Sequence, residues 1–374
     1  MQFETLEPRA TPENSMSFLL DWELTLKCNL DCSYCGTGLY GGHDNSTQHP
    51  PLDECLKTID FMYEYVDLYM AKKTPSLRKV ILNVYGGEAL HHPNIVEILS
   101  EARTRHKKYS SRWALTITNT TNAIISEKKL ENIIPLVDYF TVSYHTENTE
   151  KQKQQFKQNL IAIRNSGKSI KCVLLMHSHP DLFDDAEHMK YWLEQNQISV
   201  MPKALDHPTE WSQFNYSPKQ IIWFNKLYKS ETQPSGDKTD LSDVGRACCG
   251  GRELCLDYNY KTTEKFVYNK FTGWSCSVNW FFLHIKQVNG ELFTNKDCMM
   301  NFDNQVGPIG NLVDARSVLD KLAYELDTGT LPVIQCAKPS CWCGLCAPKA
   351  KSRSDYDSMI MKYQKGYEPK ERHI

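Results

Sequence analysis

Short apolar runs and longer amphipathic stretches alternate regularly through the first half of the sequence. The apolar runs have the length and composition of strands, and they fall at residues 19–26, 79–85, 114–118, 139–143, 169–176 and 198–201. Helical periodicity fills the stretches between them, at residues 52–72, 94–107, 126–134, 151–166 and 186–195. Strand–helix alternation builds parallel sheets with right-handed crossovers. The pattern therefore predicts an α/β fold, a partial (β/α)6 TIM-like barrel short of the eight units of a closed one.

Chemically distinctive residues recur where the predicted strands end. Cys28, Gly86, Asn122 and Ser143 all lie at or just beyond such an end. In parallel α/β architectures ligands bind at the carboxyl ends of the strands, because the loops there converge on one edge of the sheet. We therefore expect these four residues to belong to one site. The open side of a partial barrel would admit a large substrate such as a peptide.

The composition changes after the barrel. At 374 residues the chain is long enough for one sizeable core with an appended module. A stretch rich in Pro, Trp, Gln, Ser and Thr predicts a bridge, and beyond it Cys and Gly replace long helical periods. We predict an N-terminal extension, the barrel, the bridge, a small Cys-rich α+β auxiliary-cluster domain and a polar tail, at residues 1–17, 18–201, 202–240, 241–350 and 351–374.

The bulk composition disfavours some classes of function. A formal net charge of −2 offers no footprint for nucleic acid or for an anionic membrane surface. No apolar run approaches the roughly 18 residues of a membrane span, and the first residues lack both a basic leader and an apolar stretch. Fourteen cysteines without an export signal indicate metal ligation in a reducing compartment, so we expect a cytoplasmic protein.

Three cysteines within eight residues, Cys28, Cys32 and Cys35, follow the first predicted strand. Three local thiolates can hold a four-iron cluster and leave one iron open for another ligand. Two other interpretations stay open on spacing alone, namely three of four zinc ligands, or free buried thiols. Zinc ligands usually come in pairs two residues apart, whereas the first gap here is longer and no histidine follows closely. Disulfides are disfavoured because three is an odd number and such close neighbours strain the bond.

The C-x3-C-x2-C spacing, with the aromatic Tyr34 before the last cysteine, resembles the signature of the radical S-adenosylmethionine (radical SAM) enzymes. The resemblance implies that Cys28, Cys32 and Cys35 hold a [4Fe–4S] cluster, with Tyr34 beside the cofactor. It implies that the amino and carboxylate groups of S-adenosylmethionine chelate the fourth iron. One electron would then cleave the sulfonium and release a 5′-deoxyadenosyl radical that abstracts a substrate hydrogen. A flavodoxin or ferredoxin would be the electron donor.

A second motif, Gly86-Gly87-Glu88, follows the strand at 79–85. Two glycines let the backbone approach a ligand closely, and a carboxylate accepts hydrogen bonds from an ammonium group; a plain glycine turn is the alternative. Beside the cysteines, the motif resembles the family's GGE element. The resemblance implies that Gly86, Gly87 and Glu88 hold the methionine moiety, with its amino group near Glu88. The family usually has Pro after the Glu, where this chain has Ala89.

Two further strand ends carry partial matches. Thr121-Asn122-Ala123 resembles the family's Thr-Asn-Gly turn, with Ala123 in place of Gly, which implies a cofactor contact for Asn122. Ser143 stands where relatives often place a serine near the ribose. His145 is either a proton donor in the site, and then the one candidate for a catalytic side chain, or a capped surface histidine.

The last third of the chain holds nine cysteines between Cys248 and Cys346. Cys276 and Cys298 flank a predicted β-hairpin, which would bring them to one metal. The hairpin, a Gly-rich stretch and a closing C-x4-C-x-C-x2-C group resemble the SPASM or twitch extension of radical SAM enzymes, which implies one or two auxiliary iron–sulfur clusters. The candidate ligands are Cys249, Cys255, Cys276, Cys298, Cys336, Cys341, Cys343 and Cys346. The spacing departs from the usual SPASM pattern, so their assignment to clusters is open, and a zinc ribbon is the alternative.

The function implied by this resemblance is a radical SAM oxidoreductase or maturase that modifies a peptide or protein. A radical SAM enzyme acting on a small metabolite or RNA is one alternative, and a non-catalytic metal-binding interaction protein is another. The small net charge disfavours RNA, because it gives no phosphate-binding footprint.

Overall fold

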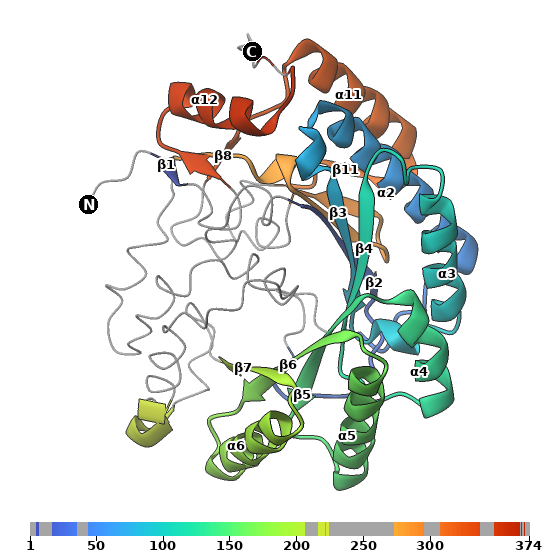
Figure 1. Ribbon diagram of the computed structural model, residues 1–374, viewed down its shortest axis with the longest axis vertical. Helices are drawn as coiled ribbons and strands as arrows, with labels where there is room; N and C mark the ends of the chain where they lie inside the picture. Colours follow the sequence, from blue (N-terminus) through green and yellow to red (C-terminus); the bar gives the residue numbers. More distant parts are fainter. Residues whose placement is uncertain are drawn as a thin grey trace.

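A nine-stranded sheet dominates the computed structural model of the protein (Figure 1), with the strand order β11-β10-β9-β2-β3-β4-β5-β6-β7. The structure describes residues 5–6, 17–35, 44–205, 216–220, 222–223, 273–294, 307–336, 348–366, 368 and 370. The six strands of the first half are β2 (Phe18–Thr25), β3 (Lys79–Gly86), β4 (Ala114–Thr121), β5 (Tyr139–His145), β6 (Ser169–Met176) and β7 (Ser199–Ala204). Each is parallel to the next, with β2 against β3 and β6 against β7 at the two ends of the run. The predicted α/β fold with a partial barrel is confirmed.

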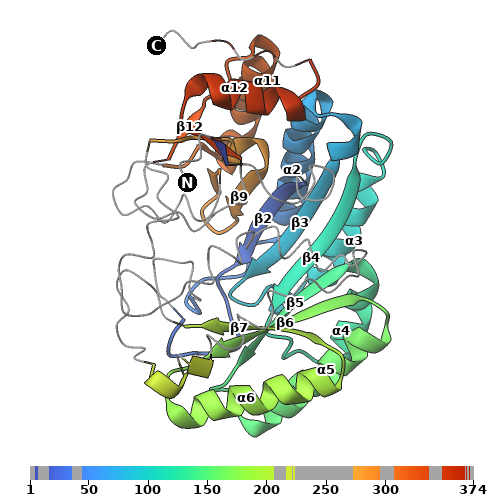
Figure 2. The ribbon, with the colours of Figure 1, turned by 60° about the vertical axis from the view of Figure 1, so that its left-hand side comes forward.

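The crossover helices line the outer side of these strands (Figures 1 and 2). They are α2 (Leu52–Lys72), α3 (Ile95–His106), α4 (Glu127–Ile133), α5 (Glu150–Asn165) and α6 (Pro180–Gln195). Four of the five agree with the predicted stretches to within about a residue at each end. The fifth, α6, begins six residues earlier than predicted, because Pro180 lies in its first turn, where a missing N–H costs nothing. None of the helices in the described ranges is both long and apolar enough to cross a membrane.

Alternation along β2 separates an apolar face from a polar one. Phe18, Leu20, Trp22 and Leu24 are fully buried on the helix side, where the ring of Phe18 lies 5.2 Å from that of Tyr69 in α2. The intervening residues, including Asp21 and Glu23, face the other side of the sheet and are buried as well. Strand β2 therefore presents mostly polar side chains to the inner face of the barrel, and Asp21, Glu23 and Thr25 among them are buried.

A C-terminal hairpin extends this sheet at the edge of β2. Strand β9 (Phe282–Lys286) lies parallel to β2, and β10 (Glu291–Phe293) and β11 (Gly310–Asn311) follow in antiparallel order. The hairpin predicted after Cys276 is confirmed, but it also adds a seventh parallel strand to the barrel. Alternating polarity within a strand cannot reveal this, because it does not specify the neighbouring strand.

A second, four-stranded sheet has the order β1-β13-β8-β12. Its strands are β1 (Thr5–Leu6), β13 (Lys349–Ala350), β8 (Ser275–Cys276) and β12 (Ile334–Gln335). Helix α11 (Ala315–Thr328) packs beside α2, and α12 (Arg353–Tyr363) packs on the small sheet (Figure 2). Single-turn 3-10 helices complete the described elements: η1 (Pro75–Leu77), η2 (Ala89–His91), η3 (Ile134–Leu136), η5 (Val278–Trp280) and η6 (Leu312–Asp314).

Lys73, at the end of α2, joins the barrel to the C-terminal part of the chain. It is fully buried, its Nζ lies 4.5 Å from the ring centroid of Phe281 and 5.5 Å from that of Phe18, and its backbone bridges to Gln364. Burial disfavours the charged ammonium and lowers the pKa of Lys73 to about 7. The aromatic faces compensate only part of this cost.

The variant Lys73→Met should weaken the pH dependence of stability. The unfolded chain binds this proton up to the ordinary lysine pKa of 10.5, whereas the folded protein releases it near 7, so stability rises with pH between those values. From pH 7 to pH 9 the wild type should gain about 2 kcal/mol of unfolding free energy relative to the variant. Urea unfolding at both values measures the difference. Lys72→Met, at a partly exposed ion pair, is the control, and equal gains in wild type and Lys73→Met would contradict the prediction.

Candidate functional site

The loop that follows β2 carries all three cysteines of the N-terminal motif. Burial raises the pKa of the Cys28 thiol to about 11 and that of Cys32 to about 12, and each of these thiols interacts electrostatically with Cys35. Binding iron would therefore displace protons from buried thiols. In the part of the chain that the structure describes, no three His, Cys, Asp or Glu side chains are placed to hold a single metal ion.

The cysteine loop is bound on one side to the turn that follows β4. Asn29 donates from Nδ2 to the carbonyl of Ile124 at 3.0 Å and accepts from Asn122 Nδ2 at 2.8 Å. The same Asn122 amide lies 3.9 Å from Cys28 Sγ. Asn122, predicted as a cofactor contact, is thus also a structural partner of the cysteine loop. The contribution of Asn29 was not predicted, although its position inside the motif was a usable signal.

Neighbouring backbone atoms leave no room for a side chain at Gly86 or Gly87. A Cβ on Gly86, whose φ is +155°, would lie 2.1 Å from the carbonyl oxygen of Thr25, and one on Gly87 would lie 2.5 Å from that of Lys27. The Gly87 and Glu88 amides each donate a 2.8 Å hydrogen bond, to the Thr25 and Lys27 carbonyls respectively. The close approach expected of these glycines is therefore made to the chain segment that leads into the cysteine loop. Their contact with a cofactor remains a prediction.

Glu88 is a buried carboxylate that accepts three hydrogen bonds. It accepts from the Asn122 backbone amide at 2.6 Å, from the Thr121 hydroxyl at 2.8 Å and from the Leu90 amide at 3.0 Å. Burial raises the pKa of Glu88, and these hydrogen bonds oppose the rise. Glu88 therefore links the end of β3 to the end of β4, which positions Asn122. Its predicted contact with an ammonium group stays a prediction.

The Asn122 turn contains a conformation that favours glycine. Ala123 has φ = 55°, the region that the family's Gly would adopt without strain. Asn159 of α5 donates from Nδ2 to the Ala123 carbonyl at 2.7 Å and to the Ile125 carbonyl at 2.9 Å, and Gln155 donates to the latter at 2.7 Å. These amides hold the turn in place with Ala123 in its positive-φ conformation.

Strand β5 brings His145 against the cysteine loop. Its Nδ1 lies 3.3 Å from Cys32 Sγ and 2.8 Å from the Tyr34 hydroxyl, and the His145 and Tyr34 rings stack at 5.9 Å. Burial lowers the pKa of His145 to about 4. The half-buried His145 ring packs against the cysteine loop, and its role as a proton donor stays a prediction. Ser143 precedes it on the same face of β5 and stays a predicted ribose contact.

Glu147, two residues beyond β5, holds the other side of the cysteine loop. It accepts from the Ser33 amide at 2.8 Å and from the Ser33 hydroxyl, and it lies 4.0 Å from His177 Nε2. Glu147 was not among the predicted site residues. Its place just after a strand end, the position that singled out the other site residues, was the signal that could have found it.

Polar side chains of the barrel's inner face form a further network beside the Gly86 turn. Asn83 donates to Asp21 Oδ1 at 2.7 Å and accepts from the Thr118 hydroxyl at 3.1 Å. The Tyr85 hydroxyl lies 3.2 Å from Nδ1 of His284, a fully buried residue of β9. The sequence could not reveal this network, because β9 pairs with β2 from the far end of the chain.

Two auxiliary-cluster candidates lie in or next to the small sheet. Cys276 of β8 pairs with Ile334 of β12, and Cys336 directly follows β12, where its amide donates to the Trp274 carbonyl at 2.9 Å. The other candidate ligands lie outside the described residues: Cys249, Cys255, Cys298, Cys341, Cys343 and Cys346. The predicted pairing of Cys276 with Cys298 therefore remains a prediction.

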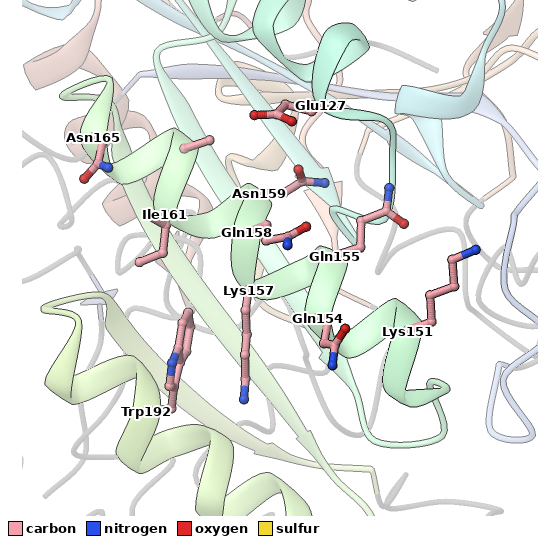
Figure 3. Close-up of a pocket in the computed structure, with 11 residues that line it drawn as sticks. Glu127, Lys151, Gln154, Gln155, Lys157, Gln158, Asn159, Ile161, Asn165 and Trp192 are labelled. Carbon is pink, nitrogen blue, oxygen red and sulfur yellow. The ribbon is translucent and has the colours of Figure 1, made fainter.

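A cavity of about 970 Å³ opens on the outer side of α5 (Figure 3). Its wall is mostly amide and ammonium side chains, with Lys157 lying over the ring of Trp192 at 5.3 Å. It contains none of the predicted site residues. Gln155 and Asn159 also line it, and their hydrogen bonds tie α5 to the Asn122 turn. The predicted site residues at the strand ends therefore lie apart from this cavity.

Comparison with known proteins gives a family match and several fold matches. Residues 22–191 match the radical SAM superfamily. No curated protein sequence matches the chain. The solved structure of anSMEcpe with bound AdoMet has 14% identity and a TM-score of 0.51, and the match covers 84% of each chain. anSMEcpe with bound AdoMet and the Kp18Cys peptide has 14% identity and a TM-score of 0.51, covering 85% of this chain and 84% of that one.

Streptococcus suis SuiB bound to S-adenosylmethionine is a third similar structure, with 12% identity and a TM-score of 0.49. The match covers 82% of this chain but only 65% of SuiB. At these identities the structural matches to anSMEcpe concern the fold, whereas the superfamily match spans the cysteine loop and the strand ends described above.

The variant Gly87→Ala should lose about 2–3 kcal/mol of unfolding free energy, because its Cβ would clash with backbone atoms that cannot move aside. Gly307→Ala is the matched control, since a Cβ there meets open space and should change stability by no more than about 0.5 kcal/mol. Urea unfolding of both variants measures the difference. Equal stabilities would show that the contact between the Gly87 turn and the Lys27 segment is not close in solution.

Proposed function

We propose that this protein is an enzyme that reductively cleaves S-adenosylmethionine and abstracts a hydrogen atom from a substrate, since residues 22–191 match the radical SAM superfamily. One observation carries the proposal. The cysteine loop, the Gly86–Glu88 turn and the Asn122 turn, which are far apart in sequence, are hydrogen bonded to one another at the carboxyl ends of β2, β3 and β4.

Each part of this arrangement has a defined task in the proposal. Cys28, Cys32 and Cys35 would hold a [4Fe–4S] cluster, which when bound supplies the electron that cleaves the sulfonium. The Gly86–Glu88 turn would hold the methionine moiety. The remaining cofactor contacts would come from Tyr34, Asn122 and Ser143. The chain's own contribution is to keep these groups rigid before the cofactor binds.

We further propose a peptide or protein as the substrate. Two observations support this choice. The inner face of the barrel offers hydrogen-bonding groups such as Asn83 and Tyr85. The structure of anSMEcpe, which has a similar fold, has been solved with a bound peptide. A flavodoxin or ferredoxin would supply the electron, and the many cysteines suit a reducing cytoplasm.

We also propose one or two auxiliary iron–sulfur clusters in the C-terminal part of the chain. The positions of Cys276 in β8 and of Cys336 directly after the neighbouring strand β12 support this, because they bring two thiols from well-separated segments to one small sheet. The remaining ligands would come from the cysteine group 341–346 and from Cys249, Cys255 and Cys298.

Anaerobically reconstituted protein, reduced with dithionite, should release 5′-deoxyadenosine from S-adenosylmethionine. Cys32→Ala should release none above background, because one iron would lose its thiolate. Cys172→Ala is the control, since this buried thiol lies in β6 and outside the cysteine loop; it should retain the activity. Chromatography of the products measures the outcome. If the wild type forms no 5′-deoxyadenosine, the proposed function is wrong.

A variant with Cys28, Cys32 and Cys35 all changed to Ala should still bind iron if auxiliary clusters exist. Each auxiliary [4Fe–4S] cluster would retain about four iron atoms per chain. Adding Cys276→Ala and Cys336→Ala should lower that content further, whereas adding Cys55→Ala and Cys172→Ala, both buried core thiols, should not. Iron and sulfide assays measure the content. Complete loss of iron in the first variant would argue against auxiliary clusters.

A further inference from the structure

The sulfur of Cys32 has two polar side chains beside it. His145 Nδ1 lies 3.3 Å away, and the Tyr34 hydroxyl is in hydrogen-bonding contact with the same sulfur. The His145 and Tyr34 rings are nearly parallel, at 3°, and their polar atoms are 2.8 Å apart. Stacking and hydrogen bonding together fix both groups next to one particular cysteine.

We propose that side chains at the carboxyl end of β5 support the iron–sulfur cluster: His145, together with Tyr34 of the cysteine loop, donates to the Cys32 sulfur, and Glu147 holds the loop that carries it. This inference rests on the proposed function. A cluster-bound thiolate can only accept hydrogen bonds, so an N–H and an O–H aimed at it become its donors. Hydrogen bonds to cluster sulfurs stabilise the reduced, more negative state and so raise the reduction potential.

The proposed role of Glu147 is to position the cysteine loop, and not to interact with the Cys32 sulfur. Ser33, which it binds through both the backbone amide and the hydroxyl, lies between Cys32 and Tyr34. A carboxylate with two donors from one residue fixes that residue in both position and orientation. Glu147 therefore holds the middle of the cysteine loop, while Asn29 and Asn122 hold its beginning. Glu147 is thus a positioning residue.

The donors of the first two cysteines differ in kind. Cys28 Sγ accepts from the Leu30 backbone amide at 3.4 Å and has the Asn122 side-chain amide at 3.9 Å. Cys32 instead has the imidazole of His145 and the phenol of Tyr34 as neighbours, and both are side-chain groups. Substitutions can therefore remove the Cys32 donors without altering the backbone, which makes the inference testable.

The first test compares midpoint potentials of the reconstituted holoenzyme, measured by dye-mediated titration with electron paramagnetic resonance. His145→Phe keeps an aromatic ring against Tyr34 but lacks Nδ1, so its potential should become more negative with the iron content unchanged. Tyr34→Phe removes only a hydroxyl and should shift the potential in the same direction, which keeps the test valid if His145→Phe fails to fold. His188→Phe is the control, because it makes the same replacement at an exposed histidine of α6, and it should keep the wild-type potential.

The second test measures the rate at which the iron chelator bathophenanthroline disulfonate removes iron from the oxidised holoenzyme. Glu147→Ala should lose iron at least fivefold faster than the wild type, whereas Glu150→Ala, three residues later and exposed, should match the wild type. Glu147→Gln, which keeps one oxygen acceptor, should fall between them.

The two tests separate this inference from the proposed function. Unchanged potentials in His145→Phe and Tyr34→Phe, or wild-type iron loss in Glu147→Ala, would overturn the roles proposed for these side chains while cluster binding and S-adenosylmethionine cleavage persist. A wild-type protein that binds no [4Fe–4S] cluster would overturn both.

Discussion

The site depends on one close approach of backbone to backbone. The end of β3 touches the segment between β2 and the cysteine loop so tightly that side chains at Gly86 and Gly87 would overlap carbonyl oxygens. Two main-chain hydrogen bonds of 2.8 Å seal this contact. A cluster-binding loop has few apolar side chains to hold its shape, so its position must come from neighbouring rigid strands. Parallel pairing of β2 with β3 provides that rigidity.

Buried polar groups extend the same contact around the site. Glu88 accepts hydrogen bonds from the turn that follows β4, and Asn122 of that turn donates to Asn29. Glu147, just beyond β5, accepts from Ser33. A buried carboxylate is costly unless its oxygens are satisfied, so such a network specifies one arrangement and penalises others. The loop is held from both sides by side chains on different strands. This is the preorganisation that radical chemistry at an open iron would require.

Motifs at strand ends were predictable from the sequence because the parallel fold brings strand ends together. Cys28, Gly86, Asn122 and Ser143 were grouped on that basis, and the structure places the first three within one hydrogen-bonded assembly. Glu147 and Asn29 were not predicted, although a strand end and the cysteine motif marked their positions, because their hydrogen-bond partners lie far away in the chain. The same holds for His284, which reaches Tyr85 only because β9 joins the edge of β2.

The sequence by itself determined the strand–helix alternation, the polarity of each strand face and the local cysteine spacing, since these depend on residues near one another in the chain. Only the tertiary structure decided that Gly86 and Gly87 allow close contact with the segment leading into the cysteine loop. The same holds for the contact of His145 with Cys32 and for the C-terminal hairpin that extends the sheet. The physical reason is that periodicity encodes which face of an element is buried but not which element covers it. Partners distant in sequence are selected by packing and by the need to satisfy buried polar groups.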